Sequence, residues 1–210
     1  MNENRCMQAD EATFGRPSGF APRLAYYHPN ARGTGCAMKL ERIPATREEE
    51  GCFMATLANQ LTIGDMRSPN PTYPRFDWEG SIVVKLGFSD LCQILQVLRG
   101  ECESIGDGRG LFHQTPRAAT RIVLRHMLEP VSGYSLETYR TPSGGGEEGK
   151  AHILISQAEA VGLESVISGS LALVCFGVPE AVAAPARGAG SQAGGVRAGK
   201  AEARDGSEAA

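Results

Sequence analysis

The chain has 210 residues, enough for one domain of ordinary size with additional segments. Hydrophobic residues make up 41% and charged residues 21%, as in a soluble globular protein. The net charge of −3 excludes a strongly basic, histone-like particle but leaves room for a local basic face. The 26 Gly and 12 Pro residues argue against a mostly helical protein and favour a turn-rich domain that contains β-strands.

Composition divides the chain into three parts. Residues 181–210 are rich in Ala and Gly and hold few bulky apolar side chains, so they cannot bury enough surface to offset the entropy of ordering them. We therefore predict a disordered tail over 180–210, a flexible segment over 1–22 and a folded domain over 23–179. The first twenty residues show no signal-peptide pattern, and the longest apolar runs are far shorter than the ~20 residues of a membrane span, so we expect a cytoplasmic location and no membrane partner.

The first half of the domain reads as strands followed by a helix. Alternation of apolar and polar residues predicts strands over 36–43, 52–61, 76–78 and 81–86. The spacing then becomes helical, with Ser89 as the predicted N-cap, Gly100 as the end and one apolar stripe formed by Leu91, Ile94, Leu95 and Leu98.

The second half repeats this order. Strands are predicted over 110–113, 120–128, 134–140 and 151–155, with Arg121 and Arg125 on the side of their strand opposite Ile122 and Leu124. Ser156 and Glu159 form a capping-box pattern at the start of a second helix. Its predicted buried stripe consists of Ala158, Val161, Val166, Ile167, Leu171 and Val174. We expect an α+β domain built from a duplicated strands-then-helix unit.

The sequence gives little support for catalysis, a metal or a cofactor. The six cysteines form no C-x-x-C pair, and we expect Cys36, Cys52, Cys92 and Cys175 to be buried thiols. The histidines follow no catalytic pattern, and residues 106–110 lack the ending of a phosphate-binding loop and predict a turn. We therefore expect a protein that is not an enzyme and that needs neither cofactor nor metal.

Cationic and aromatic residues share several of the predicted strands. The cations are Lys39, Lys85, Arg121 and Arg125, and the aromatic residues beside them are Trp78, Phe112 and Tyr139. Such a surface suits a single strand of nucleic acid, because bases stack on the rings while cations neutralise phosphates. The alternative is a solvated sheet face whose rings lie half in the core; for Trp78 both alternatives stay open.

In the order and spacing of these stretches, the sequence resembles the Whirly family of plant single-stranded DNA-binding proteins, whose fold is related to that of the kinetoplastid mitochondrial guide-RNA-binding proteins. The resemblance lies in residues 35–44, 51–59, 73–98 and 150–177. The family carries a lysine-rich motif at the start of its first strand; residues 32–38 stand there in this chain, with Arg32 in place of one lysine.

This resemblance implies two antiparallel four-stranded sheets packed with helices, and a homotetramer that assembles through those helices. It also implies binding of single-stranded DNA with weak sequence preference, in DNA maintenance or transcription. Arg32, Lys39, Lys85, Arg121 and Arg125 would then bind phosphates. A bacterial, nucleoid-associated relative is expected, with an organellar one left open. The alternatives are a single-stranded RNA binder, or a structural or protein-interaction homo-oligomer of the same fold.

Overall fold

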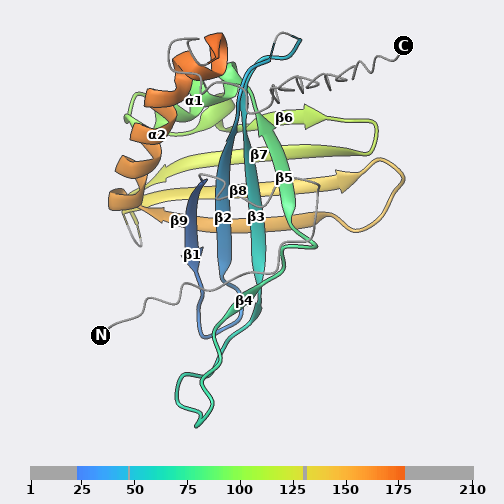
Figure 1. Cartoon of the computed structure of the whole chain (residues 1–210), viewed down its shortest axis with the longest axis vertical. Helices are drawn as coiled ribbons and strands as arrows, with labels where there is room; N and C mark the ends of the chain where they lie inside the picture. Colours follow the sequence, from blue (N-terminus) through green and yellow to red (C-terminus); the bar gives the residue numbers. More distant parts are fainter. Residues whose placement is uncertain (1–22, 47, 130–131, 178–210) are drawn as a thin grey trace, which may run out of the picture. The chain divides into compact units, whose positions relative to one another are not determined.

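The computed structural model describes residues 23–46, 48–129 and 132–177. The segments predicted to be flexible, 1–22 and 180–210, lie outside these residues. The described part contains two antiparallel sheets and two α-helices, and the strands of the second sheet run across those of the first (Figure 1).

The first sheet is centred on one long strand. Its strands are β1 (Arg23–His28), β2 (Cys36–Ile43), β3 (Cys52–Thr62), β4 (Arg75–Phe76) and β5 (Ile82–Leu86). They follow the order β1-β2-β3, after which β5 pairs with the first half of β3 and the two-residue β4 pairs with its end. The sheet therefore has five strands, but β4 and β5 share one position beside β3. It is thus four strands wide, which matches the expected four-stranded sheet.

The second sheet is a plain meander. Its strands are β6 (Leu111–Gln114), β7 (Ala118–Met127), β8 (Gly133–Pro142) and β9 (Gly149–Ser156), paired in the order of the chain. The 3₁₀ turn η1 (Ile105–Gly108) precedes it. Residues 106–110 therefore form a turn, as predicted: Gly106, Gly108 and Gly110 all have positive φ, a conformation that glycine adopts at little cost.

The two helices follow the last strand of each unit. In α1 (Phe88–Leu98) the predicted stripe is buried, and Gly100 ends the helix with a φ of +73°. The N-cap is Gly87 rather than Ser89, because the Asp90 carboxylate accepts the Gly87 N–H at 2.9 Å. In α2 (Gln157–Phe176) the predicted capping box is present: the Ser156 hydroxyl accepts the Glu159 N–H, and the Glu159 carboxylate accepts the Ser156 N–H.

The face that α2 buries differs from the predicted one. Its buried residues are Ala160, Leu163, Ile167 and Val174. Ile167 and Val174 were predicted correctly, but Ala158, Val161 and Val166 are exposed, and Val161 is 68% exposed. The helix is apolar on nearly every side, so apolar spacing alone cannot select the buried face. By length and apolar composition α2 could also cross a membrane, although here it packs one face into the core.

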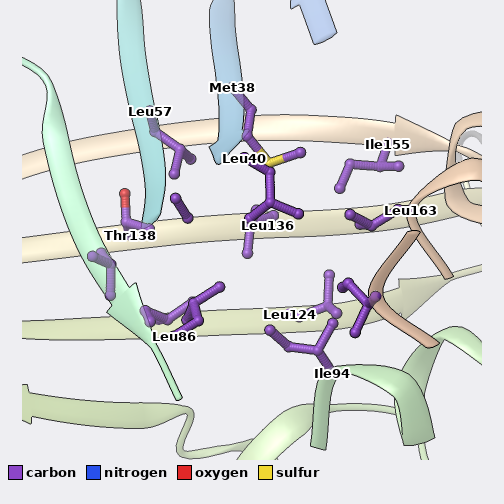
Figure 2. Close-up of a pocket in the computed structure, with 14 residues that line it drawn as sticks. Met38, Leu40, Leu57, Leu86, Ile94, Leu124, Leu136, Thr138, Ile155 and Leu163 are labelled. Carbon is purple, nitrogen blue, oxygen red and sulfur yellow. The ribbon is translucent and has the colours of Figure 1, made fainter. Parts of the chain in front are cut away.

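The core lies where both sheets and both helices meet. Figure 2 shows side chains from all four layers, among them Leu57, Ile94, Leu136 and Leu163, around a small central cavity. Its volume of about 30 Å³ is far below the roughly 150 Å³ that binds benzene in an engineered apolar cavity. The helices thus complete a core that the two sheets also line directly, and this cavity is no ligand site.

The cysteines differ in how deeply they are buried. Cys36 and Cys52 are buried, and burial raises the pKa of the Cys36 thiol to about 11, so this thiol is protonated and unreactive at neutral pH. Cys92 is half-buried. The prediction that Cys175 is buried was wrong, because this residue lies on the outward side of the last turn of α2.

Candidate nucleic-acid interface

The predicted site residues fall into two groups on the outer faces of the two sheets. Side chains alternate across a strand, so the residues that do not point into the core form an outer face on each sheet. The first outer face carries Lys39 and Lys85, with Trp78 beside it; the second carries Phe112, Arg121, Arg125 and Tyr139. Arg32 lies apart from both groups, exposed in the loop between β1 and β2.

One row of side chains crosses the whole second sheet. The register places Phe112 on β6 opposite Arg121 on β7, Arg121 opposite Tyr139 on β8, and Tyr139 opposite Lys150 on β9. Aromatic rings and cations thus alternate across four adjacent strands. We call these four residues the cation–aromatic row. Phe112 is its most open ring, with 69% of the residue exposed.

The cations of the row are held against its central ring. The Arg121 guanidinium carbon lies 4.5 Å from the centre of the Tyr139 ring, and the Lys150 ammonium nitrogen lies 5.0 Å from it. Both distances are within the ~6 Å over which a cation and an aromatic ring attract each other. The row therefore has its charges preorganised before any ligand arrives.

A carboxylate lies next to this row. Glu137, two residues before Tyr139 on β8, accepts a hydrogen bond from the Tyr139 hydroxyl and lies 3.7 Å from the Lys150 ammonium. The Tyr139 hydrogen bond is the largest cause that holds the Glu137 pKa below its ordinary value; burial opposes it, and the charges of Lys150, His152 and Arg125 add to it. Glu137 is therefore ionised at neutral pH.

The first outer face holds a separate group of rings. Tyr27, Phe76 and Trp78 lie with ring centres 5.8–6.4 Å apart, and we call them the aromatic cluster. The Lys39 ammonium lies 3.9 Å from the centre of the Trp78 ring. Trp78 is half-buried and follows β4 instead of belonging to it, so the predicted strand over 76–78 was wrong at its end.

Ser135 and His152 lie next to Glu137, but the three do not form a catalytic relay. The Ser135 hydroxyl is 3.0 Å from His152 Nε2, while the Glu137 carboxylate is the partner of Ser135 at 3.5 Å. In a Ser–His–acid triad the acid orients the histidine instead. Among residues 23–46, 48–129 and 132–177, no group of three or more His, Cys, Asp or Glu side chains is placed to bind a metal ion.

The arrangement of strands and helices matches that of known structures. No family model and no curated protein matches the sequence. The crystal structure of WHY1 from Arabidopsis thaliana matches with a TM-score of 0.59 and 15% identity, over 77% of this chain and 89% of that chain. The chain has the Whirly fold. WHY3 from Arabidopsis thaliana gives 0.57 and 16% over 75% and 90% of the two chains, and the plant transcriptional regulator PBF-2 gives 0.56 and 16% over 76% and 84%.

The Whirly fold confirms the predicted architecture but does not identify the functional residues of this chain. At such low identity the match fixes how the elements are arranged, not which side chains act. Lys150 and Glu137 were not among the predicted site residues, although alternation along β8 and β9 places Glu137 with Tyr139, and Lys150 with His152, on one face of each strand. Without the register between β8 and β9, nothing showed that these two pairs adjoin.

Proposed function

We propose that the chain binds single-stranded nucleic acid across the outer face of its second sheet. The observation that carries this proposal is the cation–aromatic row, in which two rings and two cations alternate across β6 to β9. The fold match supports it, because it strengthens the resemblance to Whirly proteins on which the expected function rests.

The chemistry of the row favours a single strand over a duplex. Exposed bases stack on aromatic rings without regard to sequence, whereas bases in a duplex are stacked on one another. Arg121 and Lys150 supply charge for phosphates, and Arg125, exposed further along β7, extends that charge. We therefore propose single-stranded DNA with weak sequence preference as the ligand, in DNA maintenance or transcription, with single-stranded RNA as the alternative.

The aromatic cluster is a second contact area for the same strand. Lys39 gives it a cation, and Tyr27 is half-exposed. The two sheets adjoin where β9 begins, because the Asn59 side chain on β3 donates to the Lys150 carbonyl at 2.8 Å and the Asn59 carbonyl accepts the N–H of Asp77, the residue before Trp78. A strand that leaves Lys150 can thus continue towards Trp78 at the edge of the domain.

We further propose that the protein is a homo-oligomer, and a tetramer in the form that the Whirly resemblance implies, assembled through α2. Its outward side is a stripe of small or apolar residues, here called the α2 stripe: Ala158, Val161, Ser165, Gly169, Ala172 and Phe176. The helix has no charged residue after Glu164. An exposed helix face without charge and with close spacing of small residues is typical of a surface that a second copy covers.

Fluorescence anisotropy with a labelled single strand of about 30 nucleotides, at two salt concentrations and in competition with a duplex, tests the binding proposal. Binding is expected to weaken with salt and to resist competition by the duplex. Arg121→Ala with Arg125→Ala is expected to weaken it at least tenfold, because two phosphate contacts are lost.

Arg67→Ala with Arg75→Ala is the matched control. It removes the same charge from the β3–β4 hairpin, which projects away from the second sheet (Figure 1). Equal losses in both double variants would show that only net charge matters and would overturn the proposed face. No binding by the wild-type protein at low salt would favour the alternative function, a structural homo-oligomer, which the α2 stripe supports by itself.

A further inference from the structure

The carboxylate of Glu137 is surrounded by groups that commonly bind phosphate. Tyr139 donates its hydroxyl to Oε2, and the Lys150 ammonium lies 3.7 Å from the same oxygen. On the other side the Ser135 hydroxyl lies 3.5 Å from Oε1 and 3.0 Å from His152 Nε2. A lysine and two hydroxyls thus converge on one anion, and the His152 imidazole contacts one of these hydroxyls.

These contacts of Glu137 contribute little to the stability of the fold. Its partners all lie on its own strand, β8, or on the neighbouring β9, and the backbone pairing of these two strands already connects them. Its side chain is 23% exposed and that of Lys150 is 56% exposed, and ion pairs that water reaches contribute little to stability. Stability therefore explains the carboxylate only in small part.

The position of Glu137 on the outer face of the second sheet offers a further explanation. Glu137 lies one row away from Arg121, Tyr139 and Lys150, and on its other side one row away from Arg125 on β7. A single strand that follows the proposed face passes over it. A fixed negative charge in that path repels the backbone, unless the carboxylate moves aside and a phosphate takes its contacts.

We propose that Ser135, Tyr139, Lys150 and His152 form a phosphodiester-binding subsite, which Glu137 fills in the absence of nucleic acid. A phosphodiester carries one negative charge and acceptor oxygens, as a carboxylate does, so the same donors suit both. Glu137 then lowers the affinity for the strand by competing with it. This inference rests on the proposed function, and it names one contact within it.

The test is Glu137→Gln, which keeps the size of the side chain and removes its charge. Single-strand affinity, measured by anisotropy, is expected to rise about fivefold or more, because a like charge leaves the path of the backbone. The slope of log affinity against log salt is expected to steepen by about 0.7, the value for one further phosphate contact with a single strand. Glu101→Gln, which removes an equal charge at an exposed position just after α1, is the matched control and is expected to change affinity little.

Lys150→Ala gives a second, independent readout. In the wild-type protein Glu137 offsets part of the Lys150 charge, so the loss of Lys150 is expected to weaken binding less than it does in the Glu137→Gln background, where it is expected to cancel the gain. Such non-additivity is the signature of two residues that act on each other.

The outcomes separate the two proposals. If the wild-type protein binds single strands and Glu137→Gln changes affinity no more than Glu101→Gln does, the subsite is wrong and the proposed function stands. If the wild-type protein fails to bind and Glu137→Gln binds, the subsite is confirmed. If neither protein binds, the subsite and the proposed function fall together.

Discussion

The Arg121 guanidinium lies 4.5 Å from the centre of the Tyr139 ring, directly across the β7–β8 pair. Lys150 approaches the same ring from β9, the strand on the other side of β8. The Tyr139 ring thus positions two cations, and its hydroxyl donates to Glu137, so this ring already has partners within the protein. Phe112, at the open end of the row, is the ring that is free for stacking.

Phe112→Ala is therefore expected to weaken single-strand binding. Stacking of one base on an aromatic side chain contributes about 1–3 kcal/mol, which corresponds to roughly a five- to 150-fold loss of affinity. The melting temperature is expected to stay the same, because the ring is mostly exposed. Phe88→Ala, which removes an exposed ring at the start of α1, serves as the control. Equal affinity of the Phe112→Ala and wild-type proteins would count against stacking at this position.

The α2 stripe predicts how self-association can be broken. A side chain at Gly169 would point into open space, so Gly169→Glu leaves the packing within one chain intact and improves the helix propensity. It also places a charge in the middle of an uncharged stripe. We expect sedimentation velocity to show a smaller species than the wild-type protein, with unchanged helical circular dichroism. Gly144→Glu adds the same charge in the β8–β9 loop, also in open space, and is expected to leave assembly unchanged; an unchanged size of the Gly169→Glu protein would remove α2 as the interface.

The sequence predicted most strands because their core-facing and outward residues alternate. In β7, for example, Ile122 and Leu124 are buried while Arg121 and Arg125 face outward. The missed strand, β1, contains Leu24, Ala25, Tyr26 and Tyr27 in a row, without alternation, and its sidedness is set by pairing with β2. α2 is the converse case, since its apolar residues surround the helix and only the packed structure selects a face.

The sequence predicted which types of residue form the candidate site, but not how they are arranged. Alternation correctly placed Arg121 and Arg125 away from the core. It could not place Phe112, Tyr139 and Lys150 beside Arg121, because a row across four strands depends on the register at three successive turns. For the same reason the sequence did not single out Glu137, because its contact with Lys150 depends on the register between β8 and β9. Nor did the sequence show the separation of Trp78 and Lys39 from the second sheet.

Leu136→Ala is expected to lower the free energy of unfolding by about 2–5 kcal/mol, the usual cost of truncating a buried leucine. The side chain lines the central cavity from the middle of β8, together with residues of both sheets and both helices (Figure 2). Leu154→Ala, on the half-exposed outer side of β9, is the control and is expected to cost about 0.5 kcal/mol or less. Urea denaturation followed by circular dichroism measures both, and similar losses would contradict the assignment of the core.

The Glu159 carboxylate predicts a loss of stability in acid. Burial alone would raise its pKa, but the Ser156 N–H, the His28 ring at 2.7 Å and the Ser156 hydroxyl outweigh burial and lower the pKa below its ordinary 4.5. The ionised form is thus favoured in the folded state. Its contribution is complete above pH 4.5 and is lost as the pH falls through the lowered value.

Glu159→Gln is therefore expected to be less stable than the wild-type protein at neutral pH, with a difference that shrinks below pH 4.5. Urea denaturation at a series of pH values measures this difference. The variant is expected to keep some acid sensitivity, because the pKa of Glu137 is lowered as well. Glu101→Gln, at an exposed position beyond α1, is expected to follow the wild-type curve. A difference between Glu159→Gln and wild type that stayed constant from neutral pH into acid would mean that Glu159 acts through its shape and hydrogen bonds, and that its charge does not hold the start of α2 against β1.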